Sequence, residues 1–313
     1  MAVNSYGDGV WSSASGSVSP FANPIRGVFI GGYTPTRIQT MDYISISTAG
    51  NATTFGSTTA AAGSSAGCGS TTRGVFNTGN TNYGGSNGIQ YFEFSSIGNS
   101  IFFGGLSQNT MAAAACNSST KGIFAGGSID GSTNTNVISY FTIATTGNGE
   151  SFGQLTVARA GLGGFSSPTR GVFGGGRASG SPSGTIEYIT IATSGNATTF
   201  GTLNTALQDI TACSNSTRGV WGGGYSGGKS AVIQYVTIAT TGNSVNFGSL
   251  LSALGETCGV ASTTRGVFGG GDTTTSVIQY ITLASTGNAT SFGVLTVARY
   301  GAGGCSSMNG GVQ

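Results

Sequence analysis

The sequence predicts an all-β fold in which six four-stranded blades form a ring, a six-bladed β-propeller. Three observations lead to this prediction. One unit recurs through the 313-residue chain, with spacings of 47, 48, 49, 48 and 47 residues between its copies. Each copy holds four short segments rich in β-branched, aromatic or glycine residues, and none has a helical period. The 58 glycines suit strands that crowd a narrow axis, where a side chain would prevent close approach.

Three landmarks define the unit. A basic residue opens a Gly-Val-Phe-Gly-like segment at Arg26, Arg73, Lys121, Arg170, Arg218 and Arg265. A tyrosine stands in a β-branched segment at Tyr43, Tyr91, Tyr140, Tyr188, Tyr235 and Tyr280. A Phe-Gly pair begins at Phe55, Phe103, Phe152, Phe200, Phe247 and Phe292. The tyrosine and the phenylalanine are always 12 residues apart, whereas the basic residue and the tyrosine are 15 to 19 apart, so one loop of each unit contains the length variation.

The fourth unit illustrates the four predicted strands. Strand A is small and apolar and covers residues 161–165. Strand B follows Arg170 and reads Gly-Val-Phe-Gly-Gly. Strand C, residues 186–191, is rich in β-branched and aromatic side chains, and strand D surrounds Phe200 and Gly201. A Ser-Gly-Asn turn joins C to D, and both Gly and Asn tolerate the positive φ angles of a tight turn.

The repeat also predicts how the ring closes. Four strands in about 40–50 residues is the size of a propeller blade, whose faces are buried by radial stacking. We expect the C-terminal strand pair, residues 292–307, to complete the first blade, so that the propeller covers residues 23–313 and residues 1–22 form an N-terminal arm. In the alternative, a degenerate strand pair within residues 1–22 closes the ring, and the C-terminal strand adds to a neighbouring subunit.

The composition excludes most chemical functions. The chain has 11 basic residues, nine acidic residues and no histidine, which excludes an imidazole as base or metal ligand. The carboxylates are scattered singly and no Cys-x-x-Cys pair occurs, so we expect no enzyme activity, no catalytic residue, no cofactor and no metal site. A net charge of +2 argues against nucleic-acid binding. The chain has no apolar run that predicts membrane insertion, and its N-terminus has no secretory signal.

Positions that recur in every unit are interpreted as structural. The basic landmark residues are expected to donate hydrogen bonds to turn carbonyls of the same or an adjacent blade, and the aromatic landmarks to fill the core between blades. The cysteines are Cys68, Cys116, Cys213, Cys258 and Cys305. They lie on separate blades, and we predict no disulfide among them. Three Asn-x-Thr sequences fall at one turn of the repeat and are interpreted as turn residues rather than glycosylation sites.

Non-repeated polar residues gather in the loops between strands B and C. Because strand direction alternates within a blade, these loops share one face with the D–A connections, and the nearly invariant A–B and C–D turns share the other face. Tyr and Arg are enriched at binding hot spots. The candidate binding residues on the B–C face, which we expect to be exposed, are Tyr33, Arg37, Tyr83, Asp130, Arg177, Tyr225, Lys229 and Asp272. The alternative explanation is that the B–C loops differ among the units through sequence drift, because nothing constrains their residues.

The unit resembles the kelch repeat of galactose oxidase and of kelch adaptor proteins. A hydrophobic strand ends in Gly-Gly and is followed, at fixed spacings, by a tyrosine and a large aromatic residue. The resemblance covers residues 26–309 and departs from the kelch pattern where Phe-Gly replaces the usual tryptophan. The phrases Thr-Arg-Gly-Val-Phe-Gly-Gly-Gly and Ile-Gln-Tyr-Ile-Thr are similar to those of kelch-like proteins from tailed phages, notably cyanophages, which look like virion or tail-fibre components.

This resemblance implies a function for the chain. It implies a non-enzymatic virion or fibre-associated propeller, made in the host cytoplasm, that presents its variable loops to a host-surface glycan or to other virion proteins, or that self-assembles. An intracellular kelch-type adaptor is one alternative, although such adaptors usually carry a further domain, for which this chain has almost no room. A capsid-decorating protein without a ligand is the other alternative.

Overall fold

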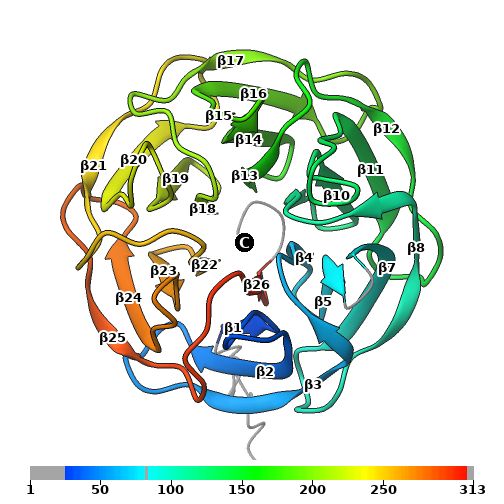
Figure 1. Cartoon of the computed structure of the whole chain (residues 1–313), viewed down its shortest axis with the longest axis vertical. Helices are drawn as coiled ribbons and strands as arrows, with labels where there is room; N and C mark the ends of the chain where they lie inside the picture. The colour runs from blue at the N-terminus through cyan, green and yellow to red at the C-terminus, as the bar shows by residue number, and fades with distance from the viewer. Residues whose placement is uncertain (1–24, 82–83, 309–313) are drawn as a thin grey trace, which may run out of the picture.

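The structure, a computed structural model, describes residues 25–81 and 84–308. Six antiparallel sheets are arranged radially around a central axis (Figure 1). The described residues form strands, turns and loops but no helix, which confirms the predicted all-β propeller of six blades. In this part of the chain no helix is long and apolar enough to cross a membrane.

Each blade has four main strands, named A to D from the axis outward. Strand A of blades 1 to 6 is β26 (Gly303–Ser306), β4 (Gly67–Gly69), β9 (Ala114–Asn117), β13 (Ala160–Ser166), β18 (Thr211–Ser214) and β22 (Cys258–Ala261). Strand B is β1 (Arg26–Ile30), β5 (Arg73–Asn77), β10 (Lys121–Ala125), β14 (Arg170–Ala178), β19 (Arg218–Gly222) and β23 (Arg265–Gly269). Every strand B therefore begins at its basic landmark residue.

Strands C and D form the outer half of each blade. Strand C is β2 (Ile38–Ser45), β7 (Gly84–Glu93), β11 (Val137–Thr142), β16 (Thr185–Thr190), β20 (Val232–Thr237) and β24 (Val277–Thr282). Strand D is β3 (Thr53–Ala62), β8 (Ile101–Thr110), β12 (Glu150–Gln154), β17 (Thr198–Thr202), β21 (Val245–Ser249) and β25 (Thr290–Val294). Two short strands in B–C loops, β6 (Asn80–Thr81) and β15 (Ser181–Pro182), occur in one copy each, so the repeat did not predict them.

The C-terminal strand closes the ring, as the preferred closure predicted. Strand β26 pairs antiparallel with β1, and Cys305 lies opposite Val28. Figure 1 accordingly shows the red end of the chain beside its blue beginning, in one blade. The amide of Ser307 continues this pairing with a 2.9 Å hydrogen bond to the carbonyl of Arg26. The predicted N-terminal arm, residues 1–22, lies outside the described residues.

The hydrophobic core lies between neighbouring blades. One cluster joins Cys116, Ile123 and Phe152 of blade 3 to Phe173 and Ile189 of blade 4. In every blade the landmark tyrosine and phenylalanine meet edge to face, with ring centroids 5.7 to 6.1 Å apart. The phenylalanines are buried, whereas the tyrosines are only partly buried. The basic landmark residue of the same blade lies over each tyrosine ring and covers one face of it.

All five cysteines are free and buried, in agreement with the prediction of no disulfide. Their sulfur atoms fill small spaces between blades: that of Cys116 lies against Gly171, and that of Cys213 lies against Gly266. Burial in apolar surroundings disfavours the thiolate. It raises the pKa of the thiols of Cys68, Cys213 and Cys258 to about 12.

The basic landmark residues join each blade to the next. Nη1 of Arg170 donates to the carbonyls of Ile238 and Ala239, at the end of strand C in blade 5, over 2.9 Å each. The other five reach the corresponding carbonyls of their own next blade. Six interblade contacts of one kind therefore surround the ring.

The Gly-Asn turns between strands C and D make a second set of interblade contacts. The amide of Gln154 donates to Oδ1 of Asn196 in the next blade over 3.1 Å, and the carbonyl of Gly195 lies against Gly153. The same contacts recur at the other five blade junctions. A Cβ atom on Gly153 would collide with that carbonyl, which explains why the landmark phenylalanine is always followed by glycine. The three Asn-x-Thr sequences begin at asparagines of this turn.

Two buried ion pairs were not predicted. Nη2 of Arg159 lies 3.0 Å from Oε1 of Glu187, and Nη2 of Arg299 lies 2.5 Å from Oδ2 of Asp42. All four side chains are fully buried. Each arginine belongs to a D–A connection, and each carboxylate belongs to strand C of the blade that follows. Burial lowers the pKa of both guanidinium groups, and the paired carboxylate opposes this shift.

Candidate functional site

The B–C loops and the D–A connections meet on one face of the ring, which we call the loop face. Backbone bridges join the two kinds of segment, for example Tyr33 with Tyr300 and Tyr225 with Gln208. The A–B and C–D turns lie on the opposite face, where the basic landmark residues and the turn asparagines make their repeated contacts. The loop face therefore carries the residues that differ among the blades.

Six residues surround the axis where the D–A connections reach strand A. This inner ring consists of Ser64, Ala112, Gly161, Asp209, Glu256 and Gly301. All six have φ between 50° and 66°, and the left-handed conformation costs a non-glycine residue about 1–2 kcal/mol. Each blade donates one backbone hydrogen bond to the carbonyl of the preceding member, for example from Ser64 to Gly301 over 2.7 Å and from Glu256 to Asp209 over 3.1 Å. These six bonds form a closed cycle that fixes the mouth of the central channel.

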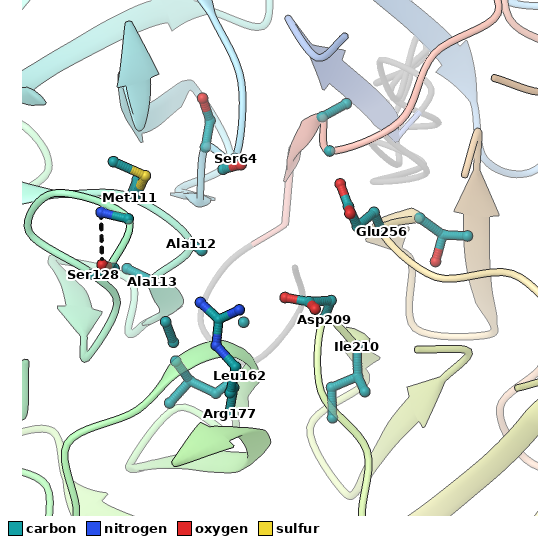
Figure 2. A pocket seen from close by; sticks show the side chains of 17 residues that line it. Ser64, Met111, Ala112, Ala113, Ser128, Leu162, Arg177, Asp209, Ile210 and Glu256 are labelled. Carbon is teal, nitrogen blue, oxygen red and sulfur yellow. Dashed lines mark hydrogen bonds between the residues drawn. The ribbon is translucent and has the colours of Figure 1, made fainter. Parts of the chain in front are cut away.

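A cavity of about 290 Å³ lies at this channel mouth (Figure 2). Figure 2 shows the side chains of Arg177 and Asp209 pointing into it from neighbouring blades, with Glu256 on the same side as Asp209. Leu162 and Ile210 add apolar surface to the wall. Deeper in the channel the walls are mainly alanine, glycine and threonine of the A strands, and the free volume falls to about 90 Å³.

A second ring of residues, the outer ring, surrounds the inner one. It consists of the residue seven positions after each basic landmark residue: Tyr33, Asn80, Ser128, Arg177, Tyr225 and Asp272. Neighbours within it are joined at two blade junctions. Nδ2 of Asn80 donates to the Tyr33 hydroxyl over 3.0 Å, and the Tyr225 hydroxyl donates to Oδ2 of Asp272 over 2.6 Å.

The structure brings five candidate binding residues into two groups. Tyr225, Lys229 and Asp272 form one group, in which Nζ of Lys229 lies 3.1 Å from Oδ2 of Asp272. Tyr33 and Arg37 form the other, with the guanidinium carbon 5.7 Å from the tyrosine ring centroid. These groups lie on blades 5 and 6 and on blade 1. The interactions within each group hold the side chains in defined positions on the loop face.

The remaining candidates lie apart from these groups. Arg177 enters the cavity without joining either group. Asp130 is exposed, and its carboxylate accepts hydrogen bonds from the backbone and hydroxyl groups of Ser132 and Thr133, which hold its pKa well below the usual range. Tyr83 lies outside the described residues.

The prediction that the candidate residues are exposed is wrong for most of them. Asp130 and Lys229 are exposed. The half-buried candidates are Tyr33, Arg37, Arg177, Tyr225 and Asp272. The physical reason is contact with the D–A connections: the Tyr33 ring covers Gly63, and the Tyr225 ring covers Gly255. Sequence variation identified the loops of this face, but it did not show that their outer-ring residues pack against the D–A connections.

The two carboxyl groups of the inner ring have raised pKa values. Burial, followed by the nearby charges of Asp209 and Asp272, raises the pKa of Glu256 to about 7. Burial also raises the pKa of Asp209, while a hydrogen bond from Gln208 and the charge of Arg177 oppose this shift. Within the described residues neither inner-ring carboxylate belongs to an ion pair. The cavity therefore holds two carboxyl groups that form no ion pair, although the charge of Arg177 acts on Asp209.

The charged residues of the described chain form two sets, one in contacts of the landmark residues or in buried interblade ion pairs, and one on the loop face. The six basic landmark residues and the two buried ion pairs join blades. Glu93 pairs with Arg73 over 2.9 Å, and Glu150 accepts a hydrogen bond from the Tyr140 hydroxyl over 2.6 Å. The others are Arg37, Asp130, Arg177, Asp209, Lys229, Glu256 and Asp272. All of these lie on the loop face, in B–C loops or in the inner ring.

Sequence reasoning missed Asp209 and Glu256. They precede strand A, at a position where the other four copies have Ser64, Ala112, Gly161 or Gly301. Two acidic residues in a column of small residues were the signal that could have identified them. Comparison of the sequence with models of known protein families and with curated proteins finds no match.

Proposed function

We propose that this protein is a non-enzymatic binding propeller whose loop face contacts a partner. One observation carries the proposal: every described charged residue outside the basic landmarks, the acidic partners of landmark residues and the two buried ion pairs lies on the loop face. Charged side chains are scarce in this chain, at 6% of its residues, and on the loop face they stand at positions that are not repeated in every blade. On the opposite face, interblade bonds occupy the repeated positions.

The proposal includes no catalytic residue and no cofactor. The chain has no histidine, and the described residues contain no group of three or more Cys, Asp and Glu side chains arranged to hold a metal ion. Within the described residues, no hydroxyl, thiol or amine nucleophile is hydrogen-bonded to the carboxylate of Asp209 or Glu256, as a nucleophile would be to its base. Their chemistry is that of recognition through charge.

The kelch-like repeat supports a biological setting for this binding. Its phrases resemble those of tailed-phage proteins, and we propose a virion or tail-fibre location, with a host-surface glycan or another virion protein as the partner. The net charge of +2 argues against nucleic acid as a partner. An intracellular kelch-type adaptor and a ligand-free capsid-decorating protein are the alternatives. A charged loop face favours a protein with a partner over one that only decorates a capsid.

Exchange of two loops tests the proposed binding face. The loops of blades 1 and 2, residues 33–37 and 80–87, are replaced by the short blade 6 loop, residues 272–275. Binding is measured on a glycan array and on cells of a cyanobacterial panel. We expect the exchanged protein to remain folded, with one cooperative unfolding transition, and to lose at least about tenfold in binding, because binding hot spots are few and central.

The matched control changes the opposite face. Ser194→Ala alters a C–D turn on that face and is expected to leave binding unchanged. If the loop exchange leaves binding intact while Ser194→Ala abolishes it, the binding face is the opposite one. Immunoelectron microscopy of phage particles tests the virion location, and labelling of infected-cell cytoplasm without labelled particles would contradict it.

A further inference from the structure

We infer that the channel mouth binds a small zwitterion, a molecule of amino-acid or dipeptide size that carries one ammonium group and one carboxylate. The inference goes beyond the proposed role of the loops, because it concerns the cavity inside the inner ring and requires no macromolecular partner. It depends on three features: opposite charges without partners, a backbone that holds them in place, and a cavity of suitable size.

The cavity contains opposite charges that form no direct ion pair, although the charge of Arg177 acts on Asp209. The Arg177 side chain makes no hydrogen bond or ion pair with any other described residue. On the facing wall, the Asp209 carboxylate accepts one hydrogen bond, from Gln208, and the Glu256 carboxylate accepts none within the described chain. Partly buried charges are unfavourable unless a counter-charge is supplied. Figure 2 shows the guanidinium group and both carboxylates around the same space, which a ligand with both charges would fill.

The backbone prevents these groups from moving together. Asp209 and Glu256 belong to the inner ring, whose cyclic hydrogen bonds fix their backbone positions. Gly161, the neighbour of Asp209 in this ring, leaves space for the Asp209 carboxylate, because a Cβ atom at Gly161 would collide with it. Arg177 is fixed in turn by the pairing of its backbone with Ala160. The backbone positions that carry the opposite charges are thus fixed before any ligand arrives, which reduces the entropic cost of binding.

The size and lining of the cavity define the ligand. A volume of about 290 Å³ is at the lower end of the range of small-molecule sites, about 300–1,000 Å³. The apolar side chains of Met111, Leu162 and Ile210 line the wall near the charges, where they suit a short aliphatic chain. The ligand ammonium would lie at the two carboxylates, and the ligand carboxylate would lie at Arg177.

The nearby pair of Asp272 and Lys229 is not expected to bind the ligand ammonium. Asp272 lies close enough to influence Glu256, but Lys229 and the Tyr225 hydroxyl already contact its carboxylate, over 3.1 and 2.6 Å. The ammonium group therefore has two free carboxylates rather than three. This difference separates the cavity from the exposed charges around it.

Linear ω-amino acids test the inference, because their length sets the separation of the two charges. Glycine to 6-aminohexanoate are titrated calorimetrically into the full chain at pH 8, above the pKa of about 7 of Glu256. We expect saturable binding that is strongest at one chain length. Propylamine and propanoate, which carry one charge each, should bind about tenfold more weakly, since each forms only half of the charged hydrogen bonds. Absence of saturable binding, or equal binding of the single-charge probes, would overturn the inference.

Variants of the cavity residues test which charged group of the ligand each side chain binds. Arg177→Gln should reduce zwitterion affinity to that of propylamine, whereas Arg177→Lys should keep the preference for the zwitterion. Glu256→Gln should reduce zwitterion affinity to that of propanoate. Glu150→Gln, the same substitution on the outer edge of blade 3, is the matched control and should have no effect. Unchanged zwitterion binding in both Arg177→Gln and Glu256→Gln would place the ligand elsewhere and refute the inference.

The proposal of partner binding and the proposal of a zwitterion site can be refuted independently. Exchange of the loops of blades 1 and 2 leaves Arg177, Asp209 and Glu256 in place, so it tests partner binding without removing the cavity. The probe titrations test the cavity without any partner. Thermal unfolding of each variant shows whether it is folded before binding is compared.

Discussion

At the scale of single residues, position in the ring determines what a charged side chain does. Lys121 replaces arginine at one landmark and still donates to the C–D turn of the next blade, over 3.0 Å to the Ala192 carbonyl. The landmark position therefore requires a cationic donor rather than the planar guanidinium group. The Glu256 carboxylate, by contrast, accepts no hydrogen bond within the described chain, and burial raises its pKa.

The first prediction concerns the effect of Glu256 on stability. A carboxyl group with a higher pKa in the folded than in the unfolded chain stabilises the fold below its usual pKa of 4.5, and that contribution is lost as the pH rises toward 7. Glutamine imitates the protonated group at every pH. Glu256→Gln should therefore raise the free energy of unfolding by about 1 kcal/mol at pH 8, after allowance for solvent screening, and change it little at pH 4. Urea unfolding at both pH values is the measurement, and an equal effect at both would contradict it.

The second prediction concerns the thiols. Burial raises the pKa of Cys68, Cys213 and Cys258 to about 12, so almost no reactive thiolate exists at neutral pH. The native protein should react with Ellman's reagent many times more slowly than a free thiol. The unfolded and unreduced chain should show five reactive groups, and a count of three or one would indicate a disulfide.

At the scale of elements, each blade is completed by contacts from its neighbour. The C–D turn of one blade lies against the Phe-Gly pair of the preceding blade, and its asparagine accepts a hydrogen bond from that strand. This turn covers part of the outermost strand, whose free edge would otherwise invite pairing with another chain. The repeated phrases of the sequence are therefore the two halves of one interblade contact.

The third prediction tests this contact at one junction. Gly153→Ala introduces a methyl group against the carbonyl of Gly195 and should destabilise the protein by about 1–3 kcal/mol. Gly195→Ala is the matched control, because a methyl group there meets no atom within 4 Å, and it should have little effect. The measurement is the unfolding temperature of both variants, and equal destabilisation would argue against close approach as the cause.

The fourth prediction concerns the ion pair of blade 4. Arg159→Leu alone leaves Glu187 buried without its partner and should cost about 3–5 kcal/mol. The double variant Arg159→Leu/Glu187→Gln reproduces the residues that blade 5 has at these positions, Leu207 and Gln234. It should recover most of the loss, to within about 1 kcal/mol of the parent. Denaturant unfolding of the single and double variants measures the coupling, and additive effects would contradict it.

At the scale of the whole molecule, the ring depends on its last strand. Strand β26 supplies strand A of blade 1 and also lies in the channel wall, so its loss removes one blade edge and part of the axis. No other described segment pairs with the inner edge of β1. Closure therefore links the two ends of the described chain and makes the six blades one structure.

The fifth prediction tests this closure. A chain ending at Ala302 lacks β26 and should lose its single cooperative unfolding transition, because the edge of β1 and the adjoining core become exposed. A chain ending at Met308 keeps β26 and is the control, with a transition like that of the full chain. Circular dichroism during heating and size-exclusion chromatography are the measurements. A cooperative, monomeric chain ending at Ala302 would show that β26 is not required.

The sequence by itself determined the features that every blade shares. The number of blades, the four strands, the interblade packing of the landmark phenylalanines and the free cysteines all follow from spacing and residue type in six copies of one unit. Closure by the C-terminal strand followed as well, because residues 292–307 keep the landmark register. These features are local or recur at a fixed interval, so each copy supports the assignment of the others.

Only the tertiary structure decided which residues meet at the axis. Arg299 and Asp42 are 257 residues apart in the chain, and the cavity combines Arg177, Asp209 and Glu256 from three blades. The sequence contained a weak indication of the ion pairs. Strand C carries an acidic residue immediately before its landmark tyrosine only where the preceding D–A connection carries arginine. The cavity was indicated only by two acidic residues in a column of small ones, and nothing in the sequence linked Arg177 to them. Its charges converge because the ring brings the starts of all six A strands together, and that convergence depends on closure of the whole ring rather than on any one blade.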